Sequence, residues 1–208
     1  MEREVVQRSV QSIARNVCAE PKSALRATLL AEREAQSEHA SRARTDAALA
    51  ERLRAVLEER AVRCIGFYWP VAGEFDARAV LTEWLASKDA TDAREAALPV
   101  VVQPHAPMVF HAWRADSPMK SGRYRIPVPE EERVVVPDLL LVPCVGFDAD
   151  RFRLGYGGGY FDRTLAAWPA ARKPVTIGIA YEAGRLDALP RESHDMPLDA
   201  IVTEAALY

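Results

Sequence analysis

The chain has 208 residues, of which 49% are hydrophobic and 27% charged, and its formal net charge is −3. This length and composition are typical of one globular domain with a well-buried core. The small negative charge argues against a general nucleic-acid binder, which needs clustered Lys and Arg, and no apolar run approaches the ~20 residues of a membrane-spanning helix.

The N-terminal segment lacks the features of a secretory leader, because Glu2, Glu4 and Arg8 interrupt its apolar positions. The three cysteines are odd in number and far apart, and no two of them form a CxxC pair, which favours reduced thiols. We therefore expect a cytoplasmic protein with no nucleic-acid or membrane partner. Residues 1–21 are predicted to be a helical N-terminal extension, and residues 22–208 a single domain.

Helical spacing of apolar residues predicts two helices after this extension, over 22–36 and 42–60. The next segment, 62–69, has the apolar composition of a buried strand and is ended by Pro70. Asp76 follows at a position suited to cap a third helix. Two helices therefore precede the first strand, and a third follows it.

The second half of the chain alternates strands with helices. Segment 116–137 is rich in proline and charge and is predicted to be an extended excursion or lid, whereas 139–145 is nearly all apolar, as in a central parallel strand. Further strands are predicted at 98–102, 108–113, 175–180 and 200–203, with a helix over 160–168. The pattern indicates the α/β class: a single layered α/β/α domain with a mostly parallel sheet and N-terminal helices. Ligands of such sheets bind at the carboxyl ends of the strands.

The most informative stretch is Arg-Leu-Gly-Tyr-Gly-Gly-Gly-Tyr-Phe-Asp at 153–162, which holds four of the ten glycines. Glycine backbone can bring several N–H groups against one anion, and the start of the following helix adds its own free amides. Arg153 and Arg163 flank the loop with positive charge, and Asp162 offers a hard oxygen ligand for Mg²⁺. The stretch predicts a nucleotide-phosphate site. It matches neither the Walker nor the dinucleotide spacing, so a plain glycine-rich turn is the alternative.

Five segments of the chain, in the same order, resemble the 5-formyltetrahydrofolate cyclo-ligase (5,10-methenyltetrahydrofolate synthetase) family. Together they span residues 22–204. They are Lys22-Ser-Ala-Leu-Arg26, Tyr68-Trp-Pro-Val-Ala-Gly-Glu74, Pro143-Cys-Val-Gly-Phe-Asp148, Arg153 to Asp162, and Leu189-Pro-Arg-Glu-Ser-His-Asp195 continuing to Glu204.

The resemblance implies conversion of 5-formyltetrahydrofolate, including polyglutamylated forms, to 5,10-methenyltetrahydrofolate. ATP is the co-substrate and Mg²⁺ the cofactor, ADP and phosphate are released, and the formyl oxygen is phosphorylated to an iminophosphate on the way. A monomer or weak oligomer is expected. The alternatives are a sugar-phosphate isomerase or CoA-transferase on a similar scaffold, and a catalytically silent relative that binds folate or nucleotide.

Site residues carried over from the resemblance fall into four sets. ATP is expected to contact Lys22, Ser23, Ala24, Leu25, Arg26, Arg153, Leu154, Gly155, Tyr156, Gly157, Gly158, Gly159, Tyr160 and Phe161. The folate substrate is expected to contact Trp69, Glu74, Tyr156, Gly157, Gly158, Gly159 and Tyr160. Asp162 and Asp195 match the Mg²⁺ ligands, and Tyr160 and Arg153 are the candidate catalytic groups.

Without the resemblance, each of these residues has an ordinary structural explanation. Lys22 and Arg26 form an exposed basic pair four residues apart, Trp69 is a core aromatic, and Glu74 is a polar turn residue. The two aspartates are then a first-turn helix acid and a loop acid.

The chain also departs from the family pattern. Phe161 replaces a second tyrosine, Cys144 replaces a common glycine, and Arg125-Ile-Pro-Val-Pro129 lacks the usual glycine and acid. The last of these departures weakens the assignment of contacts to segment 116–130, including any role for Lys120.

Overall fold

The computed structural model describes residues 21–37, 41–87 and 94–208, so the predicted N-terminal extension lies outside the described residues apart from its last position. The helices are α1 (Lys22–Ser37), α2 (Arg42–Glu58), α3 (Arg78–Ala86) and α4 (Tyr160–Ala167). The strands are β1 (Cys64–Gly66), β2 (Glu95–Val100), β3 (Val109–Trp113), β4 (Met119–Ser121), β5 (Pro127–Pro129), β6 (Val134–Val135), β7 (Leu139–Pro143), β8 (Gly146–Phe147), β9 (Arg153–Leu154), β10 (Val175–Ile179) and β11 (Ala200–Val202).

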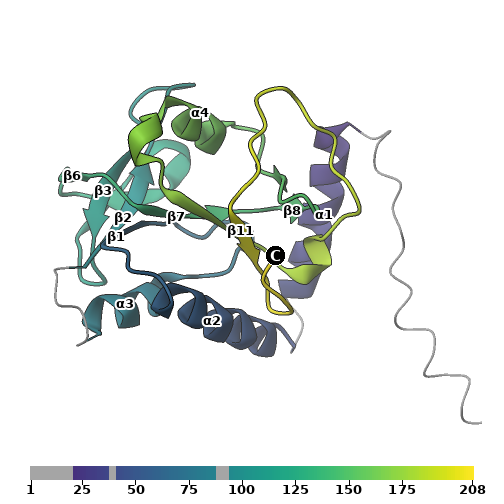
Figure 1. Cartoon of the computed structure of the whole chain (residues 1–208), viewed down its shortest axis with the longest axis horizontal. Coiled ribbons are helices and arrows are strands. Elements are labelled where there is room, and N and C mark those ends of the chain that lie inside the picture. Colours follow the sequence, from purple (N-terminus) through teal and green to yellow (C-terminus); the bar gives the residue numbers. More distant parts are fainter. Residues whose placement is uncertain (1–20, 38–40, 88–93) are drawn as a thin grey trace, which may run out of the picture.

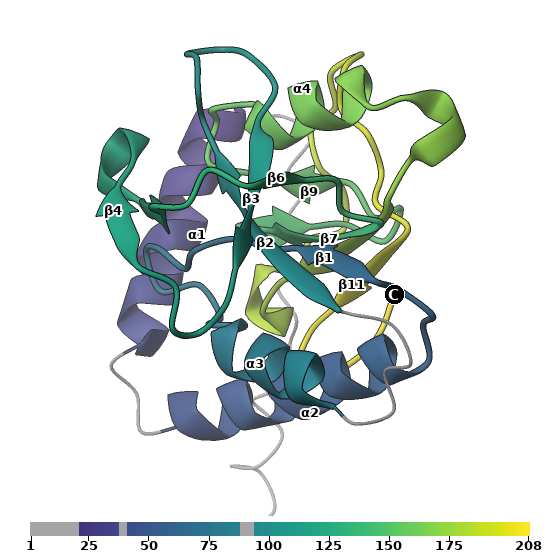
Figure 2. The ribbon, with the colours of Figure 1, turned by 90° about the vertical axis from the view of Figure 1, so that its left-hand side faces the viewer.

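A seven-stranded sheet with the order β11-β10-β7-β1-β2-β3-β6 forms the centre of the molecule. The first five strands in this order are parallel, and β3 and β6 add an antiparallel edge. Figure 1 shows α2 and α3 on one face of the sheet and α4 on the other, and Figure 2 shows β4 outside the sheet. The predicted α/β class with a mostly parallel, layered sheet is confirmed.

Strand β7 shows why this sequence forms a central strand. Its side chains alternate between two hydrophobic clusters: Leu139 and Leu141 face the cluster with α2 and α3, whereas Leu140 and Val142 face the cluster with α4. All four are fully buried, each stabilising the fold by roughly 1.5–3 kcal/mol relative to an exposed side chain. A strand covered on both faces must be apolar throughout, which is the pattern seen in the sequence.

Helix α1 packs on the carboxyl side of the sheet rather than on either face. Leu25 and Leu29 join a third cluster with Val145, Leu154 and Leu186, among others. The helix therefore lies against the segments that follow β7, and Figure 1 shows it beside β8. This packing brings the start of α1 to the end of the sheet where ligands of α/β folds bind. Among the described residues, no helix is both long and apolar enough to span a membrane.

Two predicted strands have different boundaries in the structure. The ladder of β1 covers only part of the predicted 62–69, although Phe67 and Tyr68 beyond it are still buried. The apolar run therefore predicts which residues are buried, and these continue beyond the last hydrogen-bonded residue of the strand. Strand β2 begins before the predicted 98–102, since Glu95 already pairs with Cys64. The sequence did not reveal this start because the alanines that follow Glu95 have little preference for strands.

The segment predicted as an extended excursion or lid, 116–137, contains short strands. It contains the β4–β5 hairpin and ends in β6, which pairs with β3. At the hairpin tip, Tyr124 and Arg125 adopt left-handed backbone, with φ of 58° and 59°. Contrary to the prediction, Asp76 is not itself the N-cap residue of α3, because that position is held by Ala77. Its carboxylate nevertheless accepts the Arg78 N–H at the start of the helix at 3.0 Å.

Candidate nucleotide and substrate site

The glycine loop, residues 155–159, lies between β9 and α4. Gly157 and Gly159 adopt left-handed backbone, with φ of 88° and 62°, and Gly159 is the N-cap residue of α4. Residues 156–158 are exposed. The loop therefore presents open main chain at a helix N-terminus, an arrangement that suits an anion.

Helix α1 connects the glycine loop with the segment around Asp195. Arg26 Nε donates to the Gly155 carbonyl at 2.5 Å. One turn earlier, Lys22 Nζ lies 2.5 Å from an Asp195 carboxylate oxygen and 3.0 Å from Glu192. The structure thus brings together three of the segments expected to bind the nucleotide and its metal, although they are far apart in the sequence.

Electrostatics keep the Lys22–Asp195 pair charged. Burial raises the pKa of Asp195, but hydrogen bonds from Lys22 and the Glu192 N–H outweigh it and hold the pKa below its usual value. For Lys22, burial acts to lower the pKa, and the contacts with Asp195 and Glu192 produce a net increase. Both groups are therefore ionised at neutral pH.

The second predicted metal ligand, Asp162, is also paired with a basic side chain. Its carboxylate accepts from Arg153 at 2.9 Å, and the Arg153 side chain is only 5% exposed. Within the described residues, no three acidic, histidine or cysteine side chains gather as a metal cluster. Mg²⁺ takes one or two protein carboxylates and completes its shell with phosphates and water, so its site does not require such a cluster.

Glu74 lies at the carboxyl ends of the strands, in a cavity lined by Arg33, Tyr68, Cys144, Ala180 and Tyr181. One carboxylate oxygen accepts the Val71 N–H at 2.8 Å, and the other is buried without a hydrogen-bond partner. Burial raises the pKa of Glu74 to about 7, against the opposing effects of the Val71 bond, the Arg33 charge and the Tyr156 hydroxyl. A buried carboxylate with an unused oxygen is suited to accept an N–H from a ligand.

This cavity is filled by its own side chains and has no room for a water molecule. A ligand that reaches Glu74 therefore requires side chains to move. Trp69, the predicted stacking partner for the folate ring, is half-buried, and the Arg78 guanidinium lies 4.3 Å from the centre of its ring. Arg78 is in turn held by an ion pair with Asp76.

The Tyr160 hydroxyl, the candidate catalytic hydroxyl, faces the β4–β5 hairpin. It lies 2.7 Å from the hydroxyl of Tyr124, which is otherwise exposed at the hairpin tip. Arg163 lies over the Tyr160 ring and donates to the Gly158 carbonyl. Segment 116–137, predicted as a lid, thus reaches the start of α4 through Tyr124.

Three residues predicted to contact ATP have their side chains elsewhere. Leu25 and Leu154 are each 2% exposed and belong to the hydrophobic cluster under α1, so their side chains are not available to a ligand. Phe161 lies in α4 rather than in the loop and packs against the cluster beside β7. Motif matching assigned these positions a role without regard to the direction of the side chain.

Two buried polar residues at the site were missed from the sequence. Arg33 occupies the next position of the buried stripe formed by Leu25 and Leu29 at four-residue spacing, and it is only 6% exposed. Charged residues are almost never fully buried unless paired, so its position on this stripe was a usable signal. Asp148, at 0% exposure, was quoted within a motif but given no role.

Asp148 joins the two loops that approach α1. One of its oxygens accepts the N–H groups of Asp150 and Phe152, and the other accepts Leu189 N–H and Arg191. The turn before the glycine loop and the segment leading to Asp195 are therefore fixed on one buried carboxylate. Such multiple bonds are the usual condition for burying a charge.

Comparison with known proteins gives a consistent result. The model of the 5-formyltetrahydrofolate cyclo-ligase family matches residues 18–204. A 5-formyltetrahydrofolate cyclo-ligase from Haemophilus influenzae is 32% identical over 69% of this chain and 76% of its own length. One from Escherichia coli is 35% identical over 49% of this chain and 58% of its own.

Solved structures agree in fold. A 5,10-methenyltetrahydrofolate synthetase from Aquifex aeolicus superposes with a TM-score of 0.73 at 30% identity, covering 89% of this chain and 91% of that one. A second, from Mycoplasma pneumoniae, gives 0.70 at 26% identity, covering 89% and 99%. With nearly the whole sequence matched by the family model, the chain belongs to the 5-formyltetrahydrofolate cyclo-ligase family, a family of ligases.

Proposed function

We propose that this protein converts 5-formyltetrahydrofolate to 5,10-methenyltetrahydrofolate at the expense of ATP, with release of ADP and phosphate. Family membership supports the reaction class. The observation that carries the proposal is the convergence on α1, where Arg26 bonds to the glycine loop and Lys22 pairs with Asp195. Basic side chains beside an exposed glycine loop at a helix N-terminus are suited to bind the phosphates of a nucleotide.

The chemistry explains why ATP is needed. The formyl oxygen is amide-like and a poor leaving group, so the ring cannot close while it is in place. Transfer of the γ-phosphoryl group to that oxygen releases ADP and gives an iminophosphate. N10 then attacks the formyl carbon, the C–O bond breaks, phosphate departs and N10 loses its proton. The protein's contribution to such a transfer is alignment and charge stabilisation.

Each part of the site has a task in this proposal. The main chain of residues 155–159 and the side chains of Lys22 and Arg26 bind the phosphates. Asp162 and Asp195 would hold Mg²⁺, whose charge offsets that of the phosphates when it is bound. For this to happen both carboxylates must exchange their present basic partners for the metal.

Substrate binding is assigned to the cavity at the carboxyl ends of the strands. The free oxygen of Glu74 accepts N–H groups of the pterin, and Trp69 stacks on its ring once Arg78 has moved aside. To Tyr160 we assign the donation of its hydroxyl proton to the departing oxygen. A cytoplasmic location, polyglutamylated substrates and a monomeric or weakly associated state are also predictions.

The test is an absorbance assay for the methenyl chromophore with purified protein, 5-formyltetrahydrofolate and Mg²⁺. We expect absorbance to rise with ATP and not with a non-hydrolysable ATP analogue, and ADP to form in equal amount. No ATP-dependent rise contradicts the proposed reaction. Binding of both ligands without product identifies a catalytically silent relative.

A further inference from the structure

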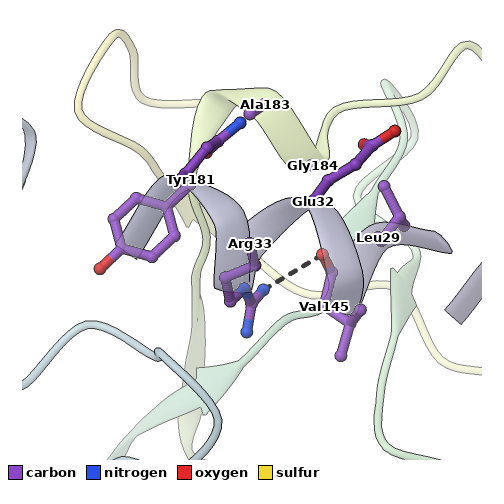
Figure 3. A pocket seen from close by; sticks show the side chains of 8 residues that line it. Leu29, Glu32, Arg33, Val145, Tyr181, Ala183 and Gly184 are labelled. Atoms are coloured by element: carbon purple, nitrogen blue, oxygen red, sulfur yellow. Dashed lines mark hydrogen bonds between the residues drawn. The ribbon is translucent and has the colours of Figure 1, made fainter. Parts of the chain in front are cut away.

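Arg33 is a buried charge on the substrate side of α1. It is 6% exposed, and one terminal nitrogen of its guanidinium donates to the Cys144 carbonyl at 2.5 Å and to the Val145 carbonyl at 3.1 Å. Figure 3 shows the guanidinium directed at Val145, with Tyr181 to one side. The cavity drawn there holds about 10 Å³, about enough for one water. Arg33 is therefore fixed to the chain that leaves the carboxyl end of β7.

The same guanidinium also reaches the glycine loop. Its other terminal nitrogen donates to the Tyr156 hydroxyl at 3.1 Å. Tyr156 is 38% exposed, so its ring lies at the surface of the loop while its hydroxyl is turned inward. One side chain of α1 thus connects the end of a central strand with a residue expected to contact both ATP and folate.

Arg33 further acts on the Glu74 carboxylate. The groups that face Glu74 are Arg33 from α1, Tyr156 from the glycine loop, Tyr68 after β1 and Cys144 after β7. Among these four, Arg33 alone carries a charge at neutral pH, because burial raises the pKa values of the two tyrosines and the cysteine. Its positive charge opposes the burial that favours protonated Glu74.

We propose that Arg33 is a positioning residue of the cyclo-ligase, which orients the Tyr156 hydroxyl and supplies the positive charge opposite the Glu74 carboxylate in the substrate cavity. The inference rests on the proposed function. It assigns to Arg33 no contact with substrate: it acts through Glu74 and Tyr156. A merely structural role, holding two carbonyls in the core, predicts lower stability without any change in the pH dependence of substrate binding.

The test compares Arg33→Met with Arg33→Lys by measuring KM for 5-formyltetrahydrofolate and kcat across pH. In Arg33→Met, Glu74 is protonated over a wider range, so KM at neutral pH rises about 5-fold while kcat changes less. The limb of the pH profile assigned to Glu74 moves to higher pH by about one unit. Arg33→Lys, which keeps a positive charge, returns the limb toward the wild-type position.

Arg54→Gln is the matched control, because it removes an arginine that is exposed and paired with Glu83. It should leave both KM and the pH profile unchanged. If Arg33→Met does not fold, Tyr156→Phe is measured instead. It removes the hydroxyl next to Glu74 without changing the packing volume, and a smaller shift in the same direction is expected.

The inference is overturned if Arg33→Met folds and its pH profile coincides with that of the wild type. If Tyr156→Phe is measured in its place, an unshifted pH profile of that variant overturns the inference. The wild-type enzyme is assayed first. Absence of wild-type turnover contradicts the proposed function, whereas normal turnover with an unshifted variant profile contradicts only the role of Arg33.

Discussion

Glu74 is expected to make this protein less stable as pH rises, whereas a salt-bridged carboxylate makes a protein more stable as pH rises. Burial raises its pKa from 4.5 to about 7. The folded protein then binds the Glu74 proton more tightly than the unfolded chain does. The resulting stabilisation is complete below pH 4.5 and is lost as pH rises through about 7. A difference of this size corresponds to about 3 kcal/mol of unfolding free energy.

Glu74→Gln tests this reasoning, because glutamine has a similar shape and does not titrate. We expect the unfolding free energy of the variant, relative to the wild type, to increase by about 3 kcal/mol between about pH 4.5 and about pH 8. Urea unfolding at the two pH values, with a common slope, measures it. The gain in stability should coincide with weaker folate binding, since the carboxylate is the proposed ligand.

Glu83→Gln is the control for this experiment. Glu83 is exposed and its pKa is lowered by a hydrogen bond from Arg54. Removing its charge takes away the stabilisation that the ionised Glu83 gains from Arg54 at high pH. The unfolding free energy of Glu83→Gln, relative to the wild type, should therefore fall slightly as pH rises. If Glu74→Gln differs from the wild type by the same amount at both pH values, the carboxylate does not titrate as a buried group and the reasoning fails.

Three further predictions concern the loops. Gly157→Ala should lower the unfolding free energy by about 1–2 kcal/mol, because its φ is 88° and a Cβ would lie 3.2 Å from the Arg26 guanidinium. The control is Gly155→Ala, which has open space at the Cβ and should change the unfolding free energy by less than about 0.5 kcal/mol. Equal values for the two variants in chemical denaturation would contradict the loop geometry. Asp162→Asn should raise the Mg²⁺ concentration needed for half-maximal rate, and an unchanged Mg²⁺ titration would remove it from the metal site. Asp148→Ala should cost about 3–5 kcal/mol, since it leaves several N–H donors without an acceptor, and a melting temperature within a degree of wild type would refute this.

The sequence predicted the layered α/β fold because its signals are local and repeated. The apolar run at 139–143 and the helical spacing of Leu49, Leu53, Val56 and Leu57 each report burial directly. Strand ends were less accurate, as in β1, because buried residues such as Phe67 continue beyond the ladder. The β8–β9 pair was missed because strands of two residues leave no periodic pattern.

The candidate site was only partly predictable. Motif matching named Lys22, Arg26 and Asp195, and the structure brings Lys22 to Asp195 and Arg26 to the glycine loop. It could not show that Asp162 and Asp195 are paired with basic side chains, because a sequence does not reveal which side chains meet: Lys22 is 173 positions from Asp195, and Arg153 is nine positions from Asp162. Arg33 was overlooked for the same reason: its partners lie more than 100 positions away.

The most direct measurement is a crystal structure of the protein with Mg-ADP. Our account predicts that the β-phosphate lies against the main chain of residues 155–159, with Lys22 released from Asp195 and the metal bound by Asp162 and Asp195. Nucleotide bound elsewhere, with both carboxylates still paired to Lys22 and Arg153, would contradict it.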